Sequence, residues 1–94
     1  MKTIETRVAR GAARLDQDLP GWENKVGLER LDIISVDTCI LGQCYGTYSD
    51  GLLKLRIDVS RARALGFHPR SRSEAQALRE SWRHFVEARR EAKP

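Results

Sequence analysis

Apolar side chains recur every three or four residues along most of this chain, with charged and polar residues between them. This spacing is typical of amphipathic helices that bury one face. It predicts a first helix over residues 4–19, capped by Thr3 and ended by Pro20-Gly21, because proline disfavours helical geometry in the residue before it. Trp22 follows this stop directly. We expect it to be a core anchor that folds the chain back, the alternative being an exposed contact aromatic.

A second helix is expected after an irregular connector over residues 23–36 that holds one helical turn. Asp37 or Thr38 is its expected cap, and Asp50-Gly51 is interpreted as a turn near its end. Gly42 and Gly46 lie four residues apart and are expected to let another backbone pack closely. Its apolar stripe comprises Ile40, Leu41, Cys44, Tyr45, Tyr48 and Leu52.

The seven residues from Leu53 alternate strictly between apolar and charged side chains, which is a strand signal. The only segment with which such a strand could pair is residues 31–36. The competing interpretation is a short helix over residues 59–65 that stops at Gly66, with Phe67 supplying the hydrophobic contact after the stop. We prefer the helix for 59–65 and leave the preceding residues open.

The last helix is the clearest element and is expected to run from about residue 73 to residue 92. Two overlapping capping boxes, Ser71-x-x-Glu74 and Ser73-x-x-Gln76, mark its start. Acidic and basic residues alternate along its polar face, which is typical of a solvated helix rather than of a nucleic-acid-binding stripe.

These elements predict a single all-α domain over residues 1–94, a compact bundle of three main helices plus a short fourth. A minor two-stranded β element formed by residues 33–36 and 53–57 is the alternative that the pattern leaves open. The expected core comprises Val8, Leu15, Leu19, Trp22, Leu31, Ile40, Leu41, Tyr45, Leu65, Phe67, Leu78, Trp82 and Phe85.

Charge is distributed unevenly over this pattern. Residues 1–53 hold six Lys/Arg and eight Asp/Glu, a net charge of −2, whereas residues 54–94 hold eleven and five, a net charge of +6. Arginine suits phosphate and carboxylate contacts because its guanidinium group forms a planar fork of donors. The alternative is a solvated surface that only aids solubility. The candidate binding residues are Arg56, Arg61, Arg63, Arg70 and Arg72.

Cysteine and histidine give little support for a metal site or a cofactor, and we expect none. Cys39 and Cys44 lie five residues apart, so on one intact helix their thiols face different ways and cannot form a disulfide. His68 and His84 lie sixteen residues apart, whereas zinc ligands usually pair at short, turn-forming spacings. We expect two small buried thiols in a reducing compartment.

The chain shows no catalytic motif, so we expect a protein that is not an enzyme. Asp16 and Asp18 do not face one substrate from a helix, since residues two apart point in different directions. The Gly42-x3-Gly46 segment has no preceding strand and no following Lys-Ser/Thr, so it is not a phosphate-binding loop. The start of the chain has no signal-peptide core and no stretch has the length of a membrane span, which predicts a cytoplasmic protein.

Three short motifs stand in a fixed order: Leu19-Pro20-Gly21-Trp22, Cys39-Ile40-Leu41-Gly42-Gln43 and Ala64-Leu65-Gly66-Phe67, before a late tryptophan. In this combination, over residues 8–86, the chain resembles small proteins of actinobacteria and their phages that share P-G-W, C-x-L-G-Q-x-Y-G and L-G-F. The resemblance implies a compact, mostly helical intracellular protein that a phage could encode. The family has no established activity and supplies no catalytic residues. Cys44 occupies a position where the pattern leads us to expect an apolar residue, which weakens any metal site built on two cysteines.

The function expected from these observations is binding to a partner protein, a host protein if a phage encodes the chain. The arginines at 61–72 would then face an acidic surface. A small DNA- or RNA-binding regulator that uses the Arg-rich 54–72 region is the alternative, and its binding would weaken steeply with salt. A homo-oligomer that uses Tyr45, Tyr48 and Leu52, or an exposed Trp22, is the third hypothesis.

Overall fold

The computed structural model describes residues 3–92, where the chain forms helices joined by turns and contains no strand. The α-helices are α1 (Ile4–Asp18), α2 (Ile40–Tyr45), α3 (Tyr48–Leu55), α4 (Val59–Ala64) and α5 (Ala75–Ala92). Three 3-10 turns complete the order, namely Trp22–Asn24, Leu28–Arg30 and Arg72–Glu74. The predicted all-α fold is therefore confirmed. The two-stranded alternative is not supported, because residues 33–36 form turns and residues 53–57 cover the end of α3 and the loop after it.

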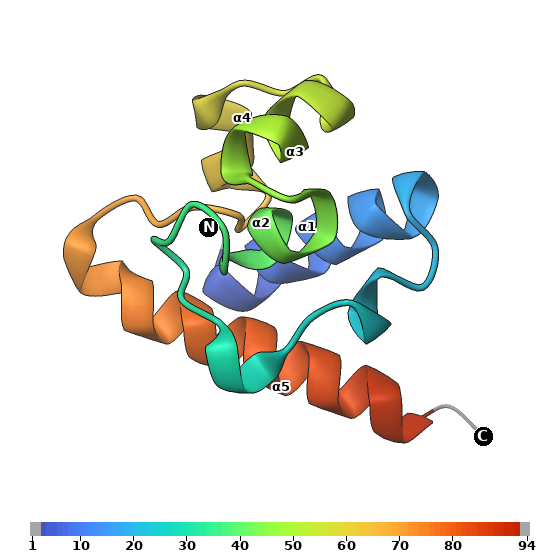
Figure 1. Cartoon of the computed structure of the whole chain (residues 1–94). Coiled ribbons are helices and arrows are strands. Elements are labelled where there is room, and N and C mark those ends of the chain that lie inside the picture. Colours follow the sequence, from blue (N-terminus) through green and yellow to red (C-terminus); the bar gives the residue numbers. More distant parts are fainter. Residues whose placement is uncertain (1–2, 93–94) are drawn as a thin grey trace.

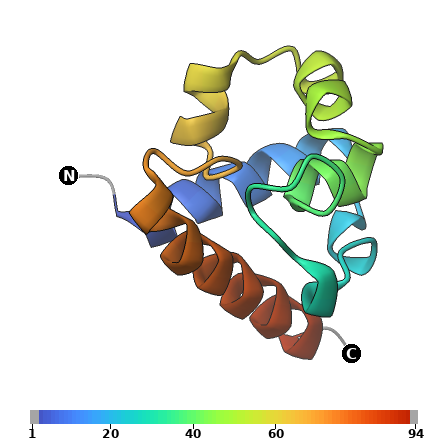
Figure 2. The ribbon, with the colours of Figure 1, turned by 60° about the vertical axis from the view of Figure 1, so that its left-hand side comes forward.

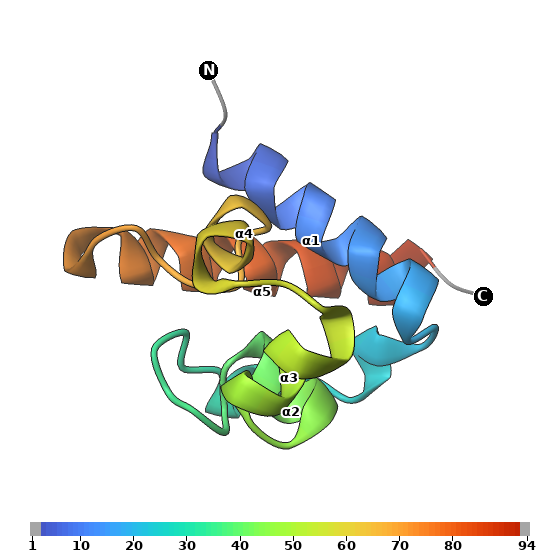
Figure 3. The ribbon, with the colours of Figure 1, turned by 90° about the horizontal axis from the view of Figure 1, so that it is seen from above.

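The two long helices, α1 and α5, pack against each other and form the base of the bundle. Figures 1 and 2 show α5 on one side of α1, with α3 and α4 on the opposite side. Seen from above, α1 crosses over α5, while α2 and α3 lie together as a pair of short helices (Figure 3). No helix within residues 3–92 combines the length and apolar character that crossing a bilayer requires.

The first helix and the tryptophan after it agree with the sequence interpretation. Thr3 caps α1 by accepting a hydrogen bond from the backbone N–H of Thr6 at 3.1 Å. Trp22 is fully buried, donates from Nε1 to Asp16 at 2.9 Å, and meets the ring of Trp82 edge-on with centroids 5.8 Å apart. Trp22 is thus the core anchor, and the hypothesis of an exposed Trp22 in a homo-oligomer is wrong.

The second predicted helix is wrong in its start, its length and its end. Cys39 is the cap, because its sulfur accepts from the Gly42 N–H at 3.3 Å. The helix breaks at Gly46, and α3 starts afresh with a cap by Thr47, so the Asp50-Gly51 pair lies inside a helix rather than in a turn. Gly42 does permit close packing as expected, since a Cβ there would lie 2.6 Å from the Val36 carbonyl oxygen.

The core contains most of the expected side chains. Ten of the thirteen are buried, whereas Leu19, Tyr45 and Phe85 lie partly buried at its edge. The aromatic centre is Trp82, which stacks on Phe67 at 5.7 Å and donates from Nε1 to the Gly66 carbonyl at 2.5 Å. The buried apolar residues absent from the expected core are Ala12, Val26, Ile33, Cys39, Leu55, Ala62 and Val86.

The end of α4 follows the predicted geometry. Gly66 has φ 75°, and the Phe67 N–H bonds back to the Ala62 carbonyl at 2.9 Å, which satisfies a carbonyl at the helix end. The start of α5 differs from the predicted capping box, because the side chain of Ser71 makes no cap and a 3-10 turn precedes Ala75. Glu74 instead accepts from the Arg70 N–H at 2.8 Å.

A buried arginine, which the sequence pattern did not indicate, fastens the segment between α4 and α5 (residues 65–74, called the linker below) to α1. Arg7 is only 1% exposed. Its guanidinium group donates to the carbonyls of Arg63 at 2.9 Å and His68 at 3.3 Å, and it pairs with the Glu74 carboxylate at 2.9 Å. The Arg7 side chain therefore connects α1 to the end of α4, to the linker and, through Glu74, to the start of α5.

This arrangement predicts a stability loss in acid that depends on Glu74. Burial alone would raise its pKa, but the hydrogen bonds from Arg70 and Arg7, together with their charges, lower the pKa below its usual value. A lowered pKa stabilises the fold above the unfolded-state value of about 4.3, and this stabilisation is lost as the pH falls through the folded-state pKa. We expect Glu74→Gln to flatten the pH dependence of the unfolding free energy in this window, measured by urea unfolding. Glu91→Gln, at the exposed end of α5, is the control and should leave the slope unchanged.

Candidate interaction surfaces

The five candidate arginines are all exposed, and their side chains form no hydrogen bond or ion pair with any residue from 3 to 92. They do not form one site. Arg56 follows α3 and lines one groove, whereas Arg61 on α4 lines another. Arg70 and Arg72 belong to the linker before α5. The structure thus leaves these guanidinium groups available but distributes them around α4.

Other arginines of the basic half have structural roles. Arg79 donates from Nε to the Leu31 carbonyl at 2.6 Å, and Arg90 donates to the carbonyls of Glu23 and Val26 at 2.5 Å each. Arg89 pairs with Asp16 at 2.5 Å and lies over the rings of Trp22 and Phe85. Arg79 and Arg90, which contribute to the excess positive charge of residues 54–94, therefore hold the connector over residues 23–36 against α5.

An apolar groove lies at the C-terminal end of α3, which we call the α3 groove. It has a volume of about 670 Å³ and is lined by Ser49, Leu52, Leu53, Arg56, Ile57 and Asp58. Leu53 is 76% exposed, and Val59, at the start of α4, is 41% exposed. The helix end itself shapes the groove, because the Ile57 N–H bonds to the Leu52 carbonyl at 3.1 Å and the Arg56 N–H bonds to the Leu53 carbonyl at 3.2 Å.

Arg56 has an unusual backbone at the rim of this groove. Its φ of 58° and ψ of 48° place it in the left-handed region, and it is the only residue other than glycine with a positive φ among residues 3–92. The equivalent position at the end of α4 is Gly66, which has no Cβ to clash. A side chain in this conformation costs about 1 kcal/mol relative to glycine. Arg56 therefore carries a strained backbone, while its side chain forms no hydrogen bond or ion pair with residues 3–92.

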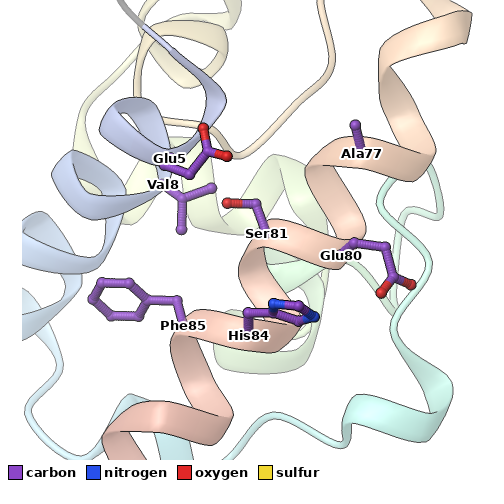
Figure 4. Close-up of a pocket in the computed structure, with 7 residues that line it drawn as sticks. All are labelled: Glu5, Val8, Ala77, Glu80, Ser81, His84 and Phe85. Carbon is purple, nitrogen blue, oxygen red and sulfur yellow. The ribbon is translucent and has the colours of Figure 1, made fainter.

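A second groove lies between α1 and α5 and is drawn in Figure 4. It has a volume of about 500 Å³, and Val8 and Phe85 provide apolar surface between the two helices. Glu5 and Glu80 give it an acidic rim, although Glu80 pairs with its neighbour Arg79 at 3.2 Å. The described residues include no group of three or more His, Cys, Asp or Glu side chains that could hold a metal ion.

The cysteines lie in surroundings that disfavour thiolate chemistry. Both are free thiols, and burial raises the pKa of Cys39 and raises that of Cys44 to about 12. Burial thus disfavours the thiolate, which is the nucleophilic form of cysteine. His68 packs on Tyr48 with ring centroids 5.4 Å apart, and burial, aided by the charge of Arg63, lowers its pKa.

A smaller cavity of about 140 Å³ lies beside these aromatic rings and under the loop before α2. Ile34 and Val36 on this loop are exposed. No arginine or lysine lines the cavity, so it offers no charged group for recognition.

A third groove, between α1 and α4, is basic. It has a volume of about 300 Å³, and Arg61 faces two arginines of α1, Arg10 and Arg14. The candidate arginines predicted from the sequence all lie in the basic half, so they do not include the two on α1. The signal that could have found them is the recurrence of arginine at positions 7, 10 and 14, which places these residues near one another on a helix.

Comparisons with protein-family models, with curated proteins and with solved structures gave no match for this chain.

Proposed function

We propose that this chain is a non-enzymatic protein that acts by binding a partner protein, with the α3 groove as the docking surface. The observation that supports the proposal is Arg56, whose strained backbone places an unpaired guanidinium group beside the exposed Leu53. Strained residues cluster at functional sites, where stability is exchanged for a required geometry. Arginine beside apolar surface is also the composition that is enriched where protein interfaces gain most of their binding energy.

The charges around the groove indicate the chemistry of the partner. Lys54 and Arg56 are exposed beside the aliphatic side chains. Asp58 is the one acidic residue in the lining, and its carboxylate caps α4 by accepting from the Arg61 N–H at 2.8 Å. A complementary partner presents an apolar side chain flanked by carboxylates. Following the resemblance, we propose a host protein in the cytoplasm as that partner.

Two variants of Arg56 separate its role in binding from its effect on stability. Arg56→Gly removes both the side chain and the backbone strain, so we expect the unfolding free energy to rise by about 1 kcal/mol while partner binding falls. Arg56→Ala removes the side chain but keeps the strain, so binding should fall without this gain in stability. Thermal unfolding and quantitative affinity capture from an actinobacterial lysate measure the two effects.

Leu53→Asp tests the apolar half of the same surface, and Arg72→Gln is a matched exposed control. We expect proteins that survive nuclease treatment to be retained by the wild type and Arg72→Gln, and lost with Leu53→Asp and both Arg56 variants. Retention by all variants would exclude the α3 groove. If instead the captured proteins vanish with nuclease, the alternative function, binding DNA or RNA through the arginines of the 54–72 region, replaces this proposal.

A further inference from the structure

The basic groove between α1 and α4 is the most strongly charged concave surface described above. Arg10 and Arg14 lie one helical turn apart on α1, and Arg61 reaches the groove from α4. Figures 2 and 3 show α4 lying next to α1, with α3 to one side. Three guanidinium groups from two helices thus line a single groove of about 300 Å³.

The positive charge of this groove is only partly balanced within residues 3–92. Asp18 pairs with Arg14 at 2.9 Å, and Arg14 also donates to the Leu55 carbonyl, which fixes its direction. Arg10 and Arg61 form no ion pair or side-chain hydrogen bond with the described residues. Arg10 and Arg61 therefore leave two uncompensated positive charges in the lining of one groove, and an anion bound there would neutralise them.

The lining indicates which anion fits. The planar fork of arginine donates two parallel hydrogen bonds to phosphate oxygens, and several arginines can share one phosphate group. Gln17 adds an amide donor at the edge, while Ala13, Ala64 and Leu65 give an apolar strip beside the charges. We infer that this groove binds the phosphate group of a ligand. The group can come from a small phosphate compound or from a nucleic-acid backbone. The inference does not depend on the α3 groove.

The test is isothermal titration of the full chain with pyrophosphate at low ionic strength. We expect Arg10→Gln/Arg61→Gln to weaken binding at least about tenfold, since two charge-assisted contacts are lost. Arg83→Gln removes an exposed charge of α5 outside the groove and should change binding less than about twofold. Arg10→Lys/Arg61→Lys keeps the charge but not the fork, and should give an intermediate affinity. Circular dichroism verifies that each variant keeps its helices.

A second arm uses a single-stranded oligonucleotide without terminal phosphates to identify the source of the group. Binding of the oligonucleotide that falls with salt and is lost in the Arg10/Arg61 variant assigns the groove to a phosphodiester backbone. Binding of pyrophosphate alone assigns it to a small phosphate compound. The inference is overturned if neither probe binds the wild type, or if Arg83→Gln weakens binding as much as the double variant. Neither result affects partner capture through the α3 groove. Phosphate binding by the basic groove and partner binding by the α3 groove can therefore be refuted independently.

Discussion

Replacing Arg7 with methionine should lower the free energy of unfolding by about 3 kcal/mol, the largest effect we expect from a single side chain. Methionine fills much of the space that the arginine side chain occupies. The stability is therefore lost because buried polar groups lose their partner, rather than because a cavity forms. The carbonyls of Arg63 and His68 lose their donor, and the Glu74 carboxylate loses its cation. Buried polar groups left without partners are strongly destabilising.

Urea unfolding followed by circular dichroism measures this effect, and Arg10→Met on the same helix is the control. Arg10 is exposed and forms no ion pair or side-chain hydrogen bond with residues 3–92. Its replacement should therefore change the free energy of unfolding by less than about 0.5 kcal/mol. Equal stabilities of the Arg7 and Arg10 variants would contradict the role assigned to Arg7. The double variant Arg7→Met/Glu74→Gln should lose less than the sum of the two single changes, because they share one ion pair.

Replacing Gly11 with alanine should destabilise the protein by at least about 2 kcal/mol. In a helix interior this change normally stabilises by up to about 1 kcal/mol. Here the added Cβ would lie 2.0 Å from the Leu65 carbonyl oxygen and 3.1 Å from the Trp82 ring. The oxygen belongs to the backbone, so the clash is relieved only if α1 moves away from the end of α4.

Gly27→Ala is the comparison, since its Cβ would lie 3.0 Å from Nε of Arg30 and 3.1 Å from Oε1 of Glu29 rather than against backbone. Both atoms are at the ends of flexible side chains that can move aside, so we expect a much smaller loss there. Thermal unfolding of both variants gives the comparison. A Gly11 variant as stable as the wild type would show that α1 and the end of α4 are not packed this closely.

The elements that the sequence predicted well are those whose signals are local. Thr3 caps α1 through a neighbour three residues away, and Gly66 ends α4 through bonds within six residues. The segment from Asp37 to Asp58 was harder to predict because its sequence signals for helix, turn and strand conflict. Cysteine is an uncommon cap, and the alternation after Leu53 arises where one helix ends and the cap of the next begins, which gives a period of two without a strand.

The sequence predicted that the candidate arginines are exposed, but it did not predict how they are arranged in the fold. Exposed arginines follow from composition, so the five candidates were identified as surface residues. The backbone strain at Arg56 has no sequence signal, because a left-handed helix end usually carries glycine or asparagine. The burial of Arg7 depends on carbonyl groups 56 and 61 residues further along the chain, a separation that periodicity does not describe.

The long-range contacts of α1 set the order in which this chain can fold during synthesis. Because α1 precedes its partners in the sequence, Arg7 can reach Glu74 only after residue 74 has been made, and Gly11 can pack against the ring of Trp82 only after residue 82 has been made. A short amphipathic helix without a packing partner is marginally stable in water. The native bundle therefore assembles as one unit, after α5 has emerged, and α1 remains accessible to chaperones and proteases until then.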